Sequence, residues 1–195
     1  SAYGRTKARG EAALRDAFPA AVILRPSVVF GPEDNFFNQL GALARLSPVM
    51  PVFSRSLFDR EGPKFQPVYV GDVADAIVLI LNGSGHAGET LELGGPDVMS
   101  WRSIVEFVLT ATERRRALMP LLLSIVKFNA FFLELLPKPM VTRDQVRSME
   151  VDNVVSNVGN GLDALGITPT PMAAIVPGYL ARFRKPGRRR GLQPE

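Results

Sequence analysis

The chain has 195 residues, of which 46% are hydrophobic and 22% charged, a balance typical of a folded domain with a sizeable core and unlike that of a disordered segment. It contains no cysteine, which excludes a disulfide scaffold, a thiolate metal site and a cysteine nucleophile. The one histidine, His86, lies in a glycine-rich loop, so we expect neither a zinc site nor any other metal.

Hydrophobic periodicity predicts alternating helices and strands. In chain order, the expected elements are a helix over residues 2–17, a strand over 21–24, a helix over 35–46, strands over 50–53 and 66–70, a helix over 73–81, a strand over 89–93 and a helix over 101–114. Asp34 or Asn35, Asp72 and Ser100 precede or open these helices and are expected to cap them. Such alternation indicates an α/β layer fold.

From residue 117 onward no strand signal is present, and we expect helices. Residues 118–136 form an apolar stretch, but Pro120, Lys127, Asn129 and Glu134 interrupt it. A membrane-spanning helix needs about 20 mostly uncharged residues, so a span is rejected. Two interpretations remain: a helix packed against the fold or a partner, or an amphipathic element in a membrane interface.

The net charge of +4 is concentrated in two places. Arg114, Arg115 and Arg116 form one cluster, and the tail over residues 181–195 holds the other. The tail is expected to be disordered, and the clusters either are simply solvated or attract an anionic membrane surface or an acidic partner. No nucleic acid is expected, because no aromatic residues alternate with the arginines to stack bases.

Tyr3 and Lys7 are the candidate chemical pair. Their spacing of four places them on one face of the predicted helix. An ammonium group beside a phenol stabilises the phenolate and so lowers the tyrosine pKa, which suits a general acid/base. Such a pair is common by chance in helices, so the surrounding sequence must show whether it is functional.

That context resembles the short-chain dehydrogenase/reductase (SDR) family in its extended and atypical forms. The motifs that carry the resemblance are Tyr-x-x-x-Lys at Tyr3 and Lys7, Arg-Pro-x-x-Val-Phe-Gly-Pro from Arg25, and Tyr-Val-Gly-Asp-Val from Tyr69. The resemblance implies that Tyr3 is the catalytic acid/base, that Lys7 orients the nicotinamide ribose, and that Pro26, Ser27, Val28 and Val29 lie along the nicotinamide. It also implies the C-terminal part of a doubly wound Rossmann-type domain over residues 1–98, followed by a mainly helical region over residues 99–180.

One branch of the family is more similar than the rest. The sequences Arg-Asp-Ala-Phe-Pro from Arg15, Gln-Pro-Val-Tyr-Val from Gln66 and Leu-Asp-Ala-Leu-Gly-Ile from Leu162 resemble the SDR-like accessory subunits of respiratory complex I, NADH:ubiquinone oxidoreductase, and their bacterial homologues. This implies bound NADP(H), or else NAD(H), and complex I subunits as partners. It also implies a peripheral place on the matrix side of the mitochondrial inner membrane or the cytoplasmic face of a bacterial one.

The glycine-rich turn that receives a pyrophosphate is absent from these residues. The start at Ser1 suggests a fragment, which we expect to be inactive, unable to hold a dinucleotide alone, and poorly folded or aggregation-prone. Three hypotheses stay open: a non-catalytic accessory or assembly subunit, an active NAD(P)-dependent reductase, epimerase or dehydratase that uses the Tyr3–Lys7 pair, and a membrane-surface module that binds lipid or quinone.

Overall fold

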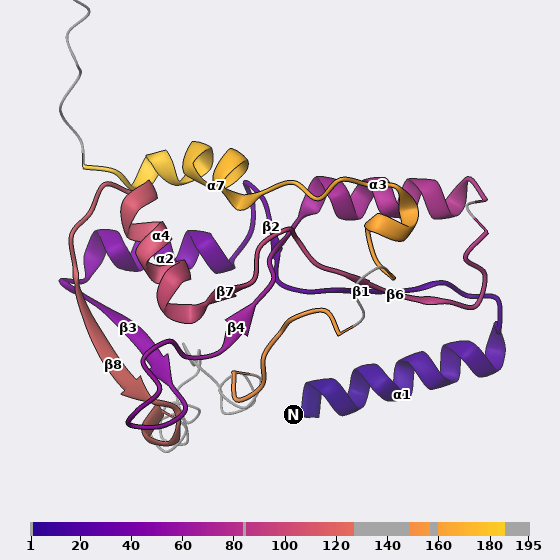
Figure 1. Cartoon of the computed structure of the whole chain (residues 1–195), viewed down its shortest axis with the longest axis horizontal. Coiled ribbons are helices and arrows are strands. Elements are labelled where there is room, and N and C mark those ends of the chain that lie inside the picture. Colours follow the sequence, from indigo (N-terminus) through magenta and orange to yellow (C-terminus); the bar gives the residue numbers. More distant parts are fainter. Residues whose placement is uncertain (1, 84, 127–148, 157–159, 186–195) are drawn as a thin grey trace, which may run out of the picture.

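The computed structural model describes residues 2–83, 85–126, 149–156 and 160–185. Its elements are α1 (Ala2–Ala17), β1 (Ile23–Pro26), β2 (Val29–Phe30), α2 (Phe36–Leu46), β3 (Val49–Ser54), β4 (Lys64–Phe65), β5 (Val68–Tyr69), α3 (Val70–Leu81), β6 (Thr90–Leu93), β7 (Met99–Ser100), α4 (Trp101–Ala111), β8 (Ala117–Leu122), the 3-10 turn η1 (Asp163–Leu165), α7 (Met172–Leu180) and the 3-10 turn η2 (Ala181–Phe183) (Figure 1).

Parallel strands between two helices form one end of the molecule. β1 pairs with β6, Ile23 opposite Thr90 and Pro26 opposite Leu93, and β2 pairs with β5 in the same parallel sense. Figure 1 shows α3 above the β1–β6 pair and α1 below it. Apolar side chains of β5, α3 and β6, together with Leu162, are buried against one another. The arrangement confirms the expected α/β Rossmann-like class, in which helices cover both faces of a parallel sheet.

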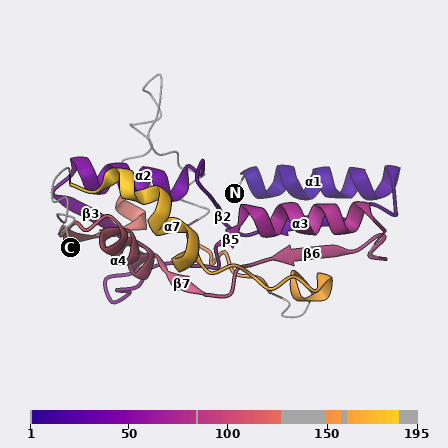
Figure 2. The ribbon, with the colours of Figure 1, turned by 90° about the horizontal axis from the view of Figure 1, so that it is seen from above.

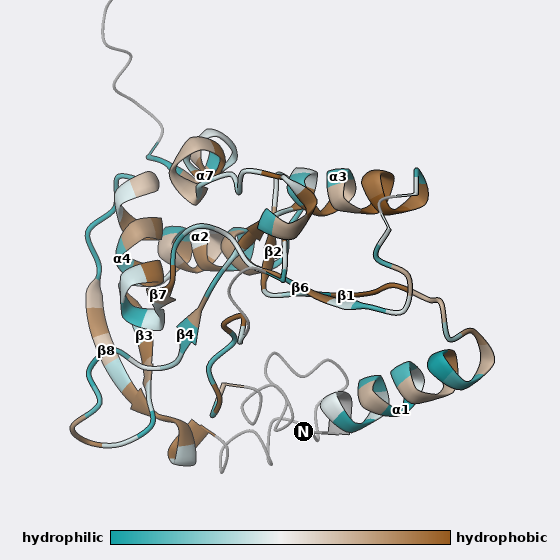
Figure 3. Ribbon diagram, turned by 45° about the vertical axis from the view of Figure 1, so that its right-hand side comes forward, coloured by the Kyte–Doolittle hydropathy of each residue, from teal (hydrophilic) through white to brown (hydrophobic). Residues whose placement is uncertain are grey.

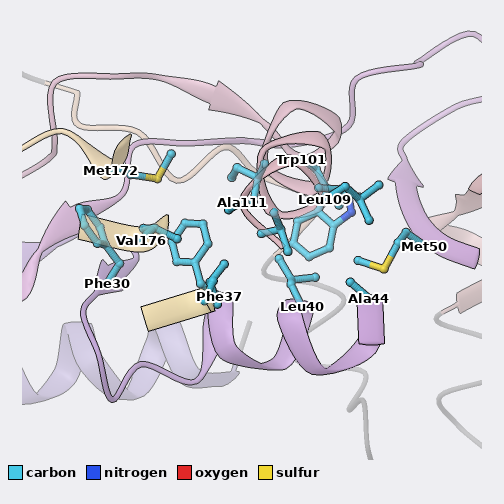
Figure 4. Packing of buried hydrophobic residues seen from close by; sticks show 14 of the residues in the cluster. Phe30, Phe37, Leu40, Ala44, Met50, Trp101, Leu109, Ala111, Met172 and Val176 are labelled. Atoms are coloured by element: carbon cyan, nitrogen blue, oxygen red, sulfur yellow. The ribbon is translucent and has the colours of Figure 1, made fainter. Parts of the chain in front are cut away.

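The other end is a helical body around a separate core. Seen from above in Figure 2, α2, α4 and α7 lie together, away from α1, α3 and β6. Figure 4 shows their buried side chains converging, with Phe37 and Leu40 of α2 facing Trp101 and Leu109 of α4 and Val176 of α7. Six residues of α4 are buried, and Ser100 caps this helix as expected, its hydroxyl accepting a bond from the Ser103 N–H at 3.0 Å.

Part of the region expected to be helical is strand. β8 pairs in parallel with β3 over six residues, Val49 opposite Ala117 and Ser54 opposite Leu122, and β7 pairs with β4 in the antiparallel sense. The apolar stretch from residue 118 therefore begins as a strand rather than a helix, because β3 offers its backbone groups as partners. Residues 127–148, which hold the rest of that stretch, lie outside the described residues. Residues of α2 and β3 share one core with those of α4 and α7.

Several arginines of the two basic clusters are bonded inside the fold. Arg114 is 8% exposed and its Nε donates to the Phe183 carbonyl at 2.7 Å, while Arg116 Nε donates to the Ala44 carbonyl at 2.8 Å. Burial, followed by the nearby Arg116 and Arg45 charges, lowers the pKa of Arg114. Ordered structure also extends into the expected tail, since η2 forms there; residues 186–195 lie outside the described part.

Among the described residues, no helix combines the length and the apolar character that crossing a bilayer requires.

Candidate functional site

Helix α1 is attached to the strands through one face. Arg15 donates to the Gly88 carbonyl at 2.9 Å and to the Thr90 hydroxyl. One turn earlier, Glu11 accepts a bond from Arg25 Nε at 3.0 Å, and the same two residues form an ion pair. This hydrogen bond is the largest influence on Glu11 and lowers the pKa of its carboxyl. Glu11 and Arg15 are the only half-buried residues over 4–17, and both bond to the strand region.

Lys7 and Tyr3 lie on the next turns of α1 toward its N-terminus. Residues at intervals of four are offset by about 40° around a helix, so the row Arg15, Glu11, Lys7 and Tyr3 winds around α1 by about 120°. Arg15 meets the start of β6 and Glu11 meets Arg25 near the end of β1, so the row continues toward the carboxyl end of β1. Tyr3 is placed by its backbone only, because its side chain lies outside the described part.

The segment that follows β1 crosses from one strand pair to the next. The Ser27 N–H donates to the Leu93 carbonyl at 2.9 Å, and the Ser27 hydroxyl donates to the Asn153 carbonyl at 2.9 Å. The Val28 carbonyl accepts a bond from the Val68 N–H at 2.9 Å. Pro26 is exposed, and Ser27, Val28 and Val29 are half-buried. These bonds fix the backbone and leave Pro26 and Val28 as a partly open apolar surface.

A hollow of about 520 Å³ adjoins the end of this segment. Its lining begins at Val29, follows the turn from Phe30 to Asn35, and is completed by Val70 at the start of α3. Gly31 is needed here, because a Cβ at this position would stand 2.7 Å from Val70 Cγ1. The hollow thus lies at the carboxyl ends of parallel strands, where open α/β sheets bind their ligands.

Asp34 organises the turn beside this hollow. Its Oδ1 accepts bonds from the N–H groups of Phe37 at 2.6 Å and Asn38 at 3.2 Å, so Asp34, not Asn35, caps α2. Its Oδ2 accepts the Gly31 N–H at 3.2 Å and the hydroxyl of Tyr179 on α7. Burial first, and the bond to Asp34 second, raise the pKa of Tyr179. The carboxylate therefore joins the turn, α2 and α7.

Asp72 differs from its expected role as a helix cap. Helix α3 begins at Val70, and Asp72 is buried in its first turn. Its two carboxylate oxygens accept bonds from the Thr170 N–H and hydroxyl, both at 2.7 Å. The sequence shows an acid at a strand-to-helix junction. It does not show the hydrogen-bond partner of Asp72, because Thr170 lies 98 residues away.

One end of a dinucleotide is the group that Lys7 and residues 26–29 are expected to hold. Pro26 is exposed and Val28 half-buried after β1, and Lys7 is an exposed residue of α1, one turn before Glu11. A pyrophosphate requires a glycine-rich turn at a helix N-terminus, and no glycine-rich motif of that kind occurs among these 195 residues. Within the described residues, no group of histidine, aspartate and glutamate side chains is suited to hold a metal ion.

Comparison with known proteins gives both a family and relatives. A family model for the RmlD substrate binding domain matches residues 1–130. NADH dehydrogenase [ubiquinone] 1 alpha subcomplex subunit 9, mitochondrial, of Mus musculus is 33% identical over 169 residues, which cover 86% of this chain and 44% of the relative. The Arabidopsis thaliana protein of the same name is 31% identical over 193 residues, covering 94% of this chain and 47% of that one. The chain thus spans about half the length of the relatives it matches.

A solved structure shares the fold. The dTDP-4-dehydrorhamnose reductase from Bacillus anthracis, crystallised in complex with NADP, superposes with a TM-score of 0.59 and 17% sequence identity, covering 93% of this chain and 53% of that chain. The likeness concerns the path of the backbone.

Proposed function

The chain belongs to the RmlD substrate binding domain family, and on that premise we propose that it forms part of a non-catalytic, nucleotide-binding accessory subunit of NADH:ubiquinone oxidoreductase. The observation that carries the proposal is the similarity to the mitochondrial NADH dehydrogenase subunits, which extends over 86% of this chain in one relative and 94% in the other. A shared domain alone would account for the first 130 residues only.

We propose NADP(H), with NAD(H) as the alternative, as the bound nucleotide. The row on α1 supports this, because Glu11 and Arg15 fix the helix and leave Lys7 one turn nearer the end of β1. Lys7 would hydrogen-bond the nicotinamide ribose, with Pro26, Ser27, Val28 and Val29 beside the ring. The pyrophosphate would be held by residues outside this sequence.

The proposed location is a peripheral one in the respiratory membrane, on the matrix or cytoplasmic side. The names of both relatives specify mitochondria, and among the described residues no helix is fit to cross a bilayer. Partner subunits of complex I, rather than the lipid surface alone, would hold the protein there.

The experiment that tests the proposal tags the intact protein in its host and solubilises membranes gently. We expect it to migrate with NADH dehydrogenase subunits on a native gel, as identified by mass spectrometry, and the denatured band to release NADP(H). A free soluble species without those subunits would contradict the accessory role.

A second candidate function is an active NAD(P)-dependent reductase. The spacing of Tyr3 and Lys7 on α1 favours it, since a purely structural protein needs no such pair. Tyr3 would pass its phenol proton to a carbonyl oxygen that becomes a hydroxyl, while reduced nicotinamide supplies hydride to the carbon. Tyr3→Phe separates the functions: loss of turnover with assembly intact supports the reductase, whereas no measurable turnover in either form supports the accessory subunit.

A further inference from the structure

A second hollow, of about 470 Å³, lies between β8, the end of β3 and the loop that follows β3. Its lining is mostly aliphatic and includes Leu118, Leu121 and Leu122 of β8, together with Ile125 and Leu57. Figure 3 shows the hydrophobic end of β8 lying against β3. The volume lies within the range of small-molecule sites, about 300–1,000 Å³.

Polar groups are gathered within the lining of this hollow. Ser54 is 3% exposed and carries its hydroxyl into this lining. Arg60 lines the hollow and, within the described part of the chain, makes neither a hydrogen bond nor an ion pair. Arg102, the other lining cation, is bonded to Glu106 at 2.9 Å. Arg60 is therefore the lining cation whose charge, within the described part of the chain, is not paired with an acid.

The acid in the same lining, Asp59, is ionised and bonded to the backbone of its own loop. Burial alone would raise the pKa of Asp59, but the backbone N–H groups of Arg55, Gly62 and Glu61 donate to its carboxylate and lower the pKa overall. Asp59 thus serves to fold the loop, and its charge is directed into that loop. Arg60 is the lining cation that remains to meet an anionic group.

We propose that this hollow binds a single anionic amphiphile, with its aliphatic chain against β8 and its anionic head group on Arg60. The aliphatic lining favours a hydrocarbon chain over a nucleotide base, because no aromatic ring lines the hollow to stack on one. The Ser54 and Ser56 hydroxyls suit the ester or glycerol oxygens between chain and head. This site is distinct from the hollow beside Asp34, since the two share no lining residue.

Two exposed apolar residues at the tip of the loop after β3 favour a ligand that reaches the hollow from a lipid phase. Leu57 is 81% exposed and Phe58 is 93% exposed, next to each other in the loop. Leu57 lines the hollow and Phe58 does not, so the two provide a matched pair of substitutions.

The test measures binding of oleoyl lysophosphatidylglycerol to the intact protein by calorimetry, below the critical micelle concentration. Zwitterionic oleoyl lysophosphatidylcholine probes the head group, and glycerol 3-phosphate probes the head without a chain. We expect the anionic lipid to bind at least about tenfold more tightly than the zwitterionic one, because the choline ammonium of the latter offsets the phosphate charge that Arg60 would meet. Glycerol 3-phosphate should not bind measurably.

Substitutions locate the binding. Arg60→Gln should weaken binding of the anionic lipid by about tenfold and binding of the zwitterionic one by less, while Leu57→Ser should weaken both. Arg115→Gln and Phe58→Ser are the controls, because both side chains are exposed and neither lines the hollow. Equal losses from Arg115→Gln and Arg60→Gln would indicate general surface attraction and overturn the site. Absence of lipid binding would also overturn it.

Discussion

The tie between Asp34 and Tyr179 joins residues that are 145 positions apart. Tyr179→Phe removes one hydrogen bond to a carboxylate that keeps its three backbone donors, so we expect the free energy of unfolding to fall by about 1–2 kcal/mol. Urea denaturation at neutral pH measures it. Tyr69→Phe is the control, because the Tyr69 hydroxyl has no hydrogen-bond partner among the described residues; it should change stability by less than about 0.5 kcal/mol.

The same tyrosine makes stability depend on alkaline pH. Burial, then the bond to Asp34, raises the pKa of Tyr179 above the unfolded value of about 10. The folded state then keeps a proton that the unfolded state loses, so the contribution is complete below about pH 10 and is lost as pH rises further. The stability difference between the natural protein and Tyr179→Phe should therefore narrow from pH 9 to 11 in urea titrations. A constant difference across that range would contradict the assignment.

The sequence predicted only the hydrogen bonds that the capping side chains make to residues close to them in the chain. The caps by Ser100 and Asp34 follow from residues three or four positions on, and the sequence pattern shows them. The partners of Asp34 on α7 and of Asp72 at Thr170 come from distant parts of the chain. Periodicity and propensity carry no information about such contacts, which only the assembled fold creates.

At the scale of elements, Gly95 holds two segments close together. A Cβ at Gly95 would lie 1.9 Å from the Pro67 carbonyl oxygen, and this oxygen belongs to backbone that leads into β5. Gly95→Ala should therefore cost about 3 kcal/mol of stability or more, because backbone atoms would have to separate. Thermal unfolding followed by circular dichroism measures the change.

Gly10 supplies the matched control in the same protein. It lies within α1, and nothing stands within 4 Å of the position that its Cβ would take. Gly10→Ala should stabilise the helix by up to about 1 kcal/mol, since alanine loses less backbone entropy than glycine. If both substitutions destabilised the protein equally, close approach would not be the reason for the glycine at position 95.

The elements themselves were largely predictable, and β8 shows where prediction stopped. Alternation and apolar runs identified α1, β1, β6 and α4 near their observed bounds. β8 contains Pro120 and lacks a clear alternation of buried and exposed residues, so its own sequence favours no strand. Its conformation comes from pairing with β3, which is a property of the tertiary structure.

At the scale of the whole molecule, α1 is the least firmly attached helix of the candidate site. No residue over 4–17 is buried, whereas α4 buries six residues. A helix of 16 residues is marginally stable without tertiary packing, so opening α1 costs mainly the breaking of its polar contacts. Hydrogen exchange with mass spectrometry should find α1 amides exchanging at least about 100-fold faster than those of α4 in this chain.

Assembly into complex I should remove the difference in amide exchange between α1 and α4 if the part of α1 that carries Tyr3 and Lys7 binds a nucleotide in the complex. Ordering α1 would then be coupled to binding, and its amides should gain protection in the complex I fraction while those of α4 change little. Arg15→Ala should speed exchange in α1 alone, because it removes two contacts to the strands. Protection of α1 equal to that of α4 in the free chain would show that contacts beyond Glu11 and Arg15 hold the helix. In that case the proposed site would be preformed, and nucleotide binding would not need a partner to order it.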